Sequence, residues 1–164
     1  MADNVSRIDC ATESVELVDA EKKIRSAAIG LLARREHSVL ELTQKLSKRF
    51  PDDVELFEPV LKRLKDDGLQ SDYRFAESYL RMRHGRGYGP TRVGLELLQR
   101  GVSDQLIALC LEEAEFDWYS TANEVLDKKY PRGVSGFSDR SKAQRFLQYR
   151  GFEHEHIREA LGGY

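Results

Sequence analysis

Apolar residues recur at helical spacing along almost the whole chain. In the first such segment, Ile24, Ala28 and Leu31 follow the i, i+4, i+7 pattern of a helix that buries one face. Further apolar stripes follow, and strand-like alternation over more than four residues is hard to find. The pattern predicts an all-α fold whose helices lie at residues of roughly 21–36, 38–50, 53–67, 72–84, 90–100, 103–115, 118–130, 138–150 and 153–162.

Residues that start and stop helices agree with most of these boundaries. Ser38, Ser103 and Ser138 are suited to N-caps, because a serine oxygen accepts a hydrogen bond from a free amide of the first turn. Gly68 fits a helix C-terminus, where a positive φ is easiest for glycine. Pro59 is the exception, since it falls inside the third stripe, so that helix is either kinked there or begins later.

The helices repeat in groups of three. One pattern recurs after 50 residues, first as Leu97, Arg100, Gly101, Ile107 and Leu111 and then as Leu147, Arg150, Gly151, Ile157 and Leu161. Each three-helix unit buries only part of its apolar surface alone, so neighbouring units are expected to stack into an elongated, curved, solenoid-like array. The predicted organisation is an acidic flexible tail at 1–20 and three repeats at 21–70, 71–117 and 118–164.

Charge is segregated along the chain although the total is nearly neutral. The 164 residues carry 26 Lys and Arg against 28 Asp and Glu, for a formal net charge of −2. Residues 81–100 and 128–150 are strongly basic, whereas residues 101–124 carry six acids and no Lys or Arg. Such blocks can steer a partner toward one face. There is no membrane-spanning apolar run and no basic, apolar leader, so we expect a cytoplasmic protein without a membrane partner.

Signals for catalysis or for a bound cofactor are weak. The glycine-rich run 83–89 joins two predicted helices and lacks the phosphate-loop pattern, and no residues have metal-ligand spacing. His154 and His156 point to different helix faces and are interpreted as a solvated helix start, while His37 and His84 are expected to be exposed. Cys110 is expected to be buried as a small hydrophobe. We therefore expect neither an enzyme nor a cofactor or metal.

The basic run around residue 86 is the most informative segment. Arg81, Arg83, Arg86 and Arg92 surround a Gly-Tyr-Gly-Pro turn, and arginine suits carboxylate and phosphate partners. Tyr88 would either contact a partner from this turn or pack on the next repeat. The arginines either meet a partner or are compensated internally, for which the acidic residues 112–117 are candidates. Both alternatives stay open from the residues alone.

Several motifs in order resemble those of the RecX family of bacterial recombination regulators. They lie across residues 20–162, and the middle one is the most specific. They are Ser38-x-x-Glu41-Leu42, Gly68-Leu69-Gln70-Ser71-Asp72-Tyr73-Arg74-Phe75-Ala76, Arg86-Gly87-Tyr88-Gly89-Pro90-x-Arg92-Val93 and Arg145-Phe146-Leu147-x-x-Arg150-Gly151-Phe152.

The resemblance implies three tandem three-helix repeats and a non-enzymatic regulator of the RecA recombinase. It implies binding to RecA and its DNA filament, within the filament groove, with inhibition of ATP hydrolysis, strand exchange and co-protease activity. We expect a monomer with, at most, a weak direct DNA contact. Charge and placement give the candidate partner-binding residues, which are Lys45, Arg49, Arg81, Arg83, Arg86, Tyr88, Arg92, Lys128, Lys129, Arg145 and Arg150. The alternative is a helical-repeat nucleic-acid-binding protein that competes with RecA for DNA.

Overall fold

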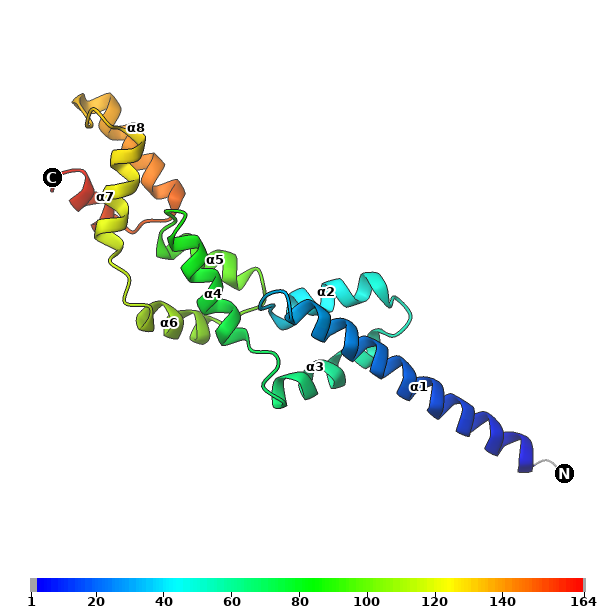
Figure 1. Cartoon of the computed structure of the whole chain (residues 1–164). Coiled ribbons are helices and arrows are strands. Elements are labelled where there is room, and N and C mark those ends of the chain that lie inside the picture. The colour runs from blue at the N-terminus through cyan, green and yellow to red at the C-terminus, as the bar shows by residue number, and fades with distance from the viewer. Residues whose placement is uncertain (1–2, 164) are drawn as a thin grey trace. The chain divides into compact units, whose positions relative to one another are not determined.

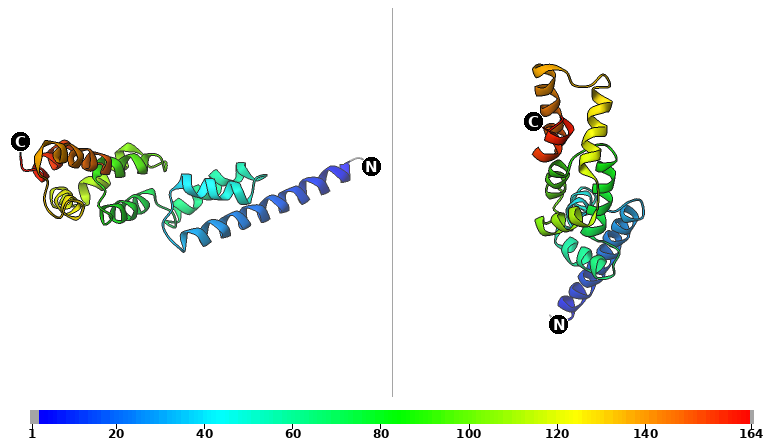
Figure 2. Two further views of the ribbon diagram at one scale, coloured as in Figure 1. Left: turned by 90° about the horizontal axis from the view of Figure 1, so that it is seen from above. Right: turned by 90° about the vertical axis from the view of Figure 1, so that its left-hand side faces the viewer.

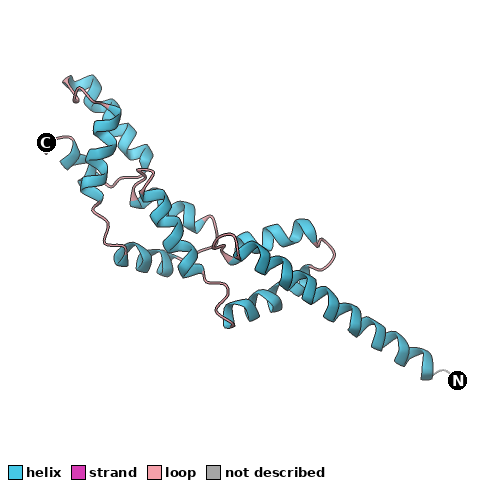
Figure 3. Ribbon diagram, in the orientation of Figure 1, coloured by secondary structure: helices cyan, strands magenta, loops and turns pink. Residues whose placement is uncertain are grey.

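The computed structural model describes residues 3–163, with side chains from residue 16 onward. Within that range the chain forms nine α-helices, one short 3-10 helix and no strand, which confirms the all-α prediction (Figures 1 and 3). The chain divides into two compact units, one ending at Asp72 and the other beginning at Tyr73. The elements are α1 (Asp3–Leu32), α2 (Val39–Arg49), η1 (Val54–Leu56), α3 (Phe57–Asp66), α4 (Asp72–His84), α5 (Pro90–Leu98), α6 (Asp104–Glu113), α7 (Trp118–Lys129), α8 (Gly136–Arg150) and α9 (His154–Ala160).

The first unit packs α1, α2 and α3 around one core. Ile24 from α1, Leu42 from α2 and Leu64 from α3 are fully buried there, as the apolar stripes predicted. Pro59 lies in the first turn of α3, which begins only at Phe57 after η1. A proline is tolerated in that turn because its missing N–H has no intrahelical acceptor. The helix therefore begins later than the apolar stripe, and the alternative of a kink is not needed.

The first helix is longer at its N-terminal end than the sequence analysis expected. It begins at Asp3 rather than near residue 21 and ends at Leu32 rather than at residue 36. Residues 3–20 contain no glycine or proline, so nothing in their sequence interrupts a helix. The N-terminal end of α1 extends beyond α2 and α3 in the views of Figure 2. The predicted flexibility of residues 1–20 stays a prediction, and residues 1 and 2 lie outside the described residues.

A buried polar network joins the start of α2 to the segment after α3. His37 is only 3% exposed, which corrects the expectation of an exposed histidine. Its backbone carbonyl accepts a hydrogen bond from Gln70 at 3.1 Å, and its ring bonds Glu41 at 2.8 Å. Burial lowers the pKa of His37, although Glu41 opposes this shift. The histidine is buried because the chain after α3 folds back over it, a contact between residues 33 positions apart.

The N-caps are confirmed at two of the three predicted serines. Ser38 Oγ accepts from the amide of Glu41 at 3.1 Å, and Ser103 Oγ accepts from the amide of Leu106 at 3.4 Å. The prediction at Ser138 is wrong, because α8 begins at Gly136 and Ser135 precedes it. Gly68 has a φ of +70°, as its place at a helix end predicted.

The second unit contains two cores, each built by three consecutive helices. Leu80, Val93 and Ile107 are buried in the core of α4, α5 and α6. Ala122 and Leu147 are buried in the core of α7, α8 and α9. Together with the first unit, these cores confirm three tandem three-helix repeats. The curvature expected of the array stays a prediction.

Aromatic side chains pack between these two cores. Trp118 packs against both cores. His84 stacks on Phe116 with ring centroids 4.0 Å apart and is hydrogen-bonded to Thr121 at 2.8 Å. The expectation that His84 is exposed is therefore wrong, because the segment after α6 covers the end of α4. Cys110 is buried, as predicted.

Gly94→Ala is expected to stabilise the protein by about 0.5–1 kcal/mol. Gly94 lies in the middle of α5, where glycine is about 1 kcal/mol less favourable than alanine. A Cβ at this position would meet Ile107 Cγ2 at 3.5 Å, an ordinary contact. Urea unfolding of both proteins measures the difference. A destabilised variant would show that α5 and α6 need the space that glycine leaves.

Candidate partner-binding site

The turn between α4 and α5 joins the second repeat to the third. The amide of Gly89 donates to the carbonyl of Arg150 at 2.9 Å, and the amide of Thr91 donates to that of Gly151 at 3.2 Å. In return, Arg150 Nη1 donates to the carbonyl of Arg86 at 2.9 Å. These backbone bonds fix the glycine-rich turn to the end of α8. We call this contact between residues 86–92 and 145–152 the joint. The motif in residues 86–92 and the motif in residues 145–152 therefore meet in space.

Two glycines permit this close approach of backbones. A Cβ on Gly89 would overlap the carbonyl group of Gly151. A Cβ on Gly151 would overlap Arg92, and Gly151 also has a φ of +86°, which disfavours any L side chain. Gly89 and Gly151 are therefore explained by packing between the second and third repeats.

Tyr88 lies among three guanidinium groups. The Arg83 Cζ is 3.6 Å from its ring centroid, and those of Arg92 and Arg150 are each 4.9 Å away. A cation placed over an aromatic face in this way is attracted by the ring's quadrupole. The ring is half-buried against the second core. Of the two alternatives for Tyr88, the structure favours packing within the joint.

Glu96 compensates the arginines that face inward. It accepts from Arg92 Nε at 3.1 Å, from Arg83 Nη2 at 2.5 Å and from the Tyr79 hydroxyl at 2.8 Å. Burial raises the pKa of the Glu96 carboxyl, but the hydrogen bonds and the charge of Arg83 together bring this pKa below its ordinary value. The Arg83 side chain is only 12% exposed. The compensation is thus internal, and it comes from Glu96 rather than from the acids at 112–117.

The predicted site residues consequently divide into joint residues and exposed bases. Arg83, Tyr88, Arg92 and Arg150 belong to the joint. Arg81 and Lys128 are exposed and pair along their own helices with Glu77 at 2.7 Å and Glu124 at 3.5 Å. The other predicted site residues of this unit are exposed and form no ion pair with any described side chain; they are Arg86, Lys129 and Arg145, which we call the basic rim.

Residues of the basic rim lie close to aromatic residues that also contact the joint. Lys129 Nζ and Arg150 Cζ lie 5.8 Å and 5.3 Å from the ring centroid of Phe146. Arg145 lies on α8 one turn before Tyr149, whose ring centroid is 4.8 Å from Arg92 Cζ. The rim therefore presents positive charge next to aromatic side chains.

Lys45 and Arg49 belong to the first unit, on α2. Both are exposed, and the Arg49 guanidinium lies 5.4 Å from the centroid of the Phe50 ring. Their membership of one face with the basic rim stays a prediction.

Two residues of this region escaped the sequence analysis. Tyr149 is 72% exposed, and its carbonyl accepts from Arg92 Nη1 at 2.9 Å. Its position directly before Arg150 in the last motif was the available signal. Glu96 is the single acid among the five arginines of residues 81–100, but it was not among the predicted site residues.

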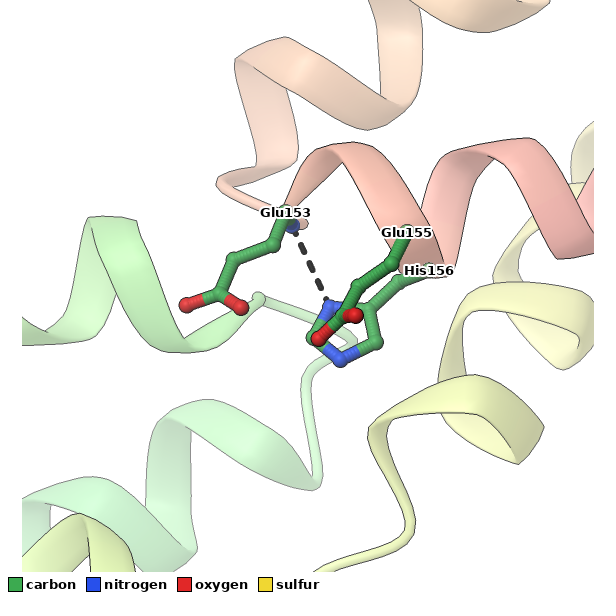
Figure 4. Close-up of side chains that lie close together, drawn as sticks. All are labelled: Glu153, Glu155 and His156. Atoms are coloured by element: carbon green, nitrogen blue, oxygen red, sulfur yellow. Dashed lines mark hydrogen bonds between the residues drawn. The ribbon is translucent and has the colours of Figure 1, made fainter.

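Three potential metal ligands lie together at the start of α9. The side-chain ligand atoms of Glu153, Glu155 and His156 lie within 4.8 Å of one another (Figure 4). His156 Nδ1 accepts a hydrogen bond from the Glu153 amide at 3.2 Å, so the imidazole caps the helix. His156 is buried, which corrects its interpretation as part of a solvated helix start, whereas His154 is exposed. Glu153 and His156 are explained as a helix cap.

The chain was compared with known proteins. The family model of the second three-helix domain of RecX matches residues 71–111, and that of the third matches residues 115–161. The chain belongs to the RecX family. Each match includes one of the two glycine-containing motifs that meet at the joint, and together the matches cover more than half of the chain.

Curated RecX relatives align over most of their length. "Regulatory protein RecX" of Pseudomonas putida (strain GB-1) is 45% identical over 149 residues, which are 90% of this chain and 94% of the relative. The protein of the same name from Halorhodospira halophila is 45% identical over 144 residues, 86% of this chain and 88% of the relative. These RecX relatives are named as regulatory proteins rather than as enzymes.

Solved RecX structures share the fold. The crystal structure of RecX from Lactobacillus salivarius matches with a TM-score of 0.74 at 24% identity, over 88% of this chain and 96% of the other. A second crystal structure, of regulatory protein RecX, has a TM-score of 0.80 at 22% identity, over 93% of this chain and 78% of the other. Among the described residues, no helix is both long enough and apolar enough to span a bilayer.

Proposed function

We propose that this RecX-family chain binds the RecA recombinase on its DNA filament and inhibits ATP hydrolysis, strand exchange and co-protease activity, by lodging in the filament groove. Membership of a family whose relatives are named regulatory proteins supports a regulatory role. The motifs of the second and third repeats, on which the resemblance to RecA regulators rests, are present and meet at one joint. The action would be binding, in the cytoplasm, without a catalytic step.

The exposure of the basic rim is the observation that assigns the proposed binding to particular residues. Arg86, Lys129 and Arg145 are exposed and form no ion pair with a described side chain, although the chain as a whole is slightly acidic. The joint next to them is fixed by backbone hydrogen bonds, so its backbone loses little conformational entropy when a partner binds. Acidic protein surface or DNA phosphate would satisfy these side chains.

The proposal is tested on the DNA-dependent ATPase of RecA. The protein is added at less than one copy per RecA, with DNA in such excess that competition for DNA is negligible. Inhibition is expected because a regulator that acts on the filament needs to occupy only part of it. Unchanged ATPase activity at saturating protein would overturn the proposal.

Replacement of Arg86, Lys129 and Arg145 together by alanine is expected to weaken this inhibition about tenfold or more, because rim charges steer and hold a charged partner. The unfolding free energy should change little, since exposed charges contribute little to stability. The matched control replaces three exposed lysines of the first unit, Lys48, Lys62 and Lys65, and removes the same charge. Equal loss in both variants would show that net charge, not the rim, matters. Arg83 is left unchanged because it is held inside the joint.

Competition for DNA is the second candidate function. The exposed ring of Tyr149 beside the Arg92 guanidinium favours it, because aromatic rings and arginines together bind unpaired bases. In that case the protein would bind bare DNA with steep salt dependence, and excess DNA would abolish its effect on RecA.

A further inference from the structure

A groove between α1 and α2 has basic walls and an apolar floor. Its volume is about 670 Å³. The two helices pack against each other in the first unit, and α1 also packs on α3 (Figures 1 and 2). The floor is apolar. Ala27, Leu31 and Phe50 are partly exposed there, and Leu46 lies buried beneath them. The walls are basic, and they consist of Lys22, Lys23, Arg34, Lys45 and Arg49.

Most of the basic side chains in the groove walls have no acidic partner. Only Lys23 is paired, with Asp19 at 3.0 Å, whereas the other four bases form no ion pair with any described side chain. The unit's cross-helix ion pairs lie between α1 and the region of α3, where Glu21 bonds Arg63 and Arg25 bonds Asp67. Beyond Lys22 the groove passes into a hollow that includes Glu16, Asp19 and Asp53. The positive stretch therefore runs from Lys22 to Arg34.

Gly30 opens the floor of the groove. Alanine or leucine is a better helix former than glycine in this last turn of α1, and a Cβ placed on Gly30 would meet nothing within 4 Å. The missing side chain lets a ligand side chain approach the α1 backbone. From Lys22 to its end at Leu32, α1 spans about 15 Å along the groove, which is about three helical turns, and Arg34 follows in the next turn of the chain.

These features favour a helix as the occupant over a nucleic acid. Helices bind grooves through apolar side chains on one face, and the floor here is mostly aliphatic. Bases instead need free aromatic faces on which to stack. The single aromatic residue lining this groove, Phe50, already carries the Arg49 guanidinium 5.4 Å from its ring centroid.

We propose that the α1–α2 groove binds an amphipathic, acidic helical segment of a partner protein, with its apolar face on Ala27 and Leu31 and its carboxylates on the basic walls. This assigns a role to Lys45 and Arg49, which are in a different unit from the basic rim. The proposal does not depend on inhibition of RecA, and its test contains no RecA. Failure of one proposal therefore leaves the other standing.

The test measures fluorescence anisotropy with the full chain at about 0.15 M salt. The first probe is a labelled peptide of about 14 residues with leucines on one helical face and glutamates on the other. The second has the same composition with the leucines scattered, and the third is a thymidine oligonucleotide of about 15 nucleotides. The amphipathic peptide is expected to bind at least about tenfold more tightly than either of the other probes.

Two pairs of variants separate the groove from general charge. Gly30→Leu fills the floor and is expected to weaken binding of the amphipathic peptide about tenfold or more, whereas Gly30→Ala leaves it nearly unchanged. Both variants favour the helix, so loss of fold is not expected. Lys45→Glu should weaken binding, whereas Lys48→Glu, on the same helix but outside the groove, should do so much less.

Three results would overturn the proposal. Equal affinity for the two peptides would show that only charge is recognised. Tighter binding of the oligonucleotide would assign the groove to nucleic acid. Absence of peptide binding, or peptide binding that Gly30→Leu leaves intact, would show that the groove is not the site.

Discussion

Gly151→Ala is expected to destabilise the second unit by about 2–5 kcal/mol. Two costs combine at this position. A non-glycine residue at a φ of +86° costs about 1–2 kcal/mol, and the new Cβ overlaps Arg92, which adds an overpacking cost of about 1–3 kcal/mol. The joint would separate or shift, because the carbonyl of Gly151 also accepts the Thr91 amide.

Gly133→Ala is the matched control. Gly133 has a φ of +78°, but a Cβ there would meet nothing within 4 Å, so only the conformational cost of about 1–2 kcal/mol remains. Urea unfolding is followed by the fluorescence of Trp118, the single tryptophan, which packs against both cores of the second unit. Equal losses in the two variants would contradict the close approach at the joint.

Glu96→Gln is expected to lower the stability of the second unit by about 2–3 kcal/mol. The substitution keeps the shape of the side chain but removes the charge that compensates Arg83, which is only 12% exposed. Removing one partner of a buried ion pair is costly because the other charge is left without compensation. Glu77→Gln is the control, since the Glu77–Arg81 pair is exposed and should contribute well under about 1 kcal/mol.

The pH dependence of unfolding gives a second readout for Glu96. The pKa of this carboxyl is lower in the folded protein than its ordinary value, so the folded state favours the ionised form. The resulting stability is present above the unfolded pKa and is lost as pH falls through the folded pKa. Glu96→Gln should reduce this acid-induced loss in the Trp118 signal. An unchanged pH profile would show that Glu96 does not carry the stability of the joint.

Local patterns predicted most of the helices and the three-helix repeats. Helical spacing of apolar residues depends on neighbours three and four positions apart, and all of that information lies within one segment. The same holds for the caps at Ser38 and Ser103. The start of α1 was misjudged because its acidic residues break the apolar pattern without breaking the helix. Pro59 left two alternatives, and η1 resolved them.

The motifs of the candidate site were predicted from the sequence. Which of its basic residues are paired inside the protein and which are exposed was not. By itself the sequence determined an all-α chain of three repeats and the run of arginines, glycines and Tyr88 that resembles the RecX family. Only the tertiary structure decided that Arg83, Arg92 and Arg150 turn inward around Tyr88 and Glu96, and that Arg86, Lys129 and Arg145 stay exposed. The physical reason is that these contacts join residues up to 64 positions apart, so a charge's partner depends on how the second and third repeats pack.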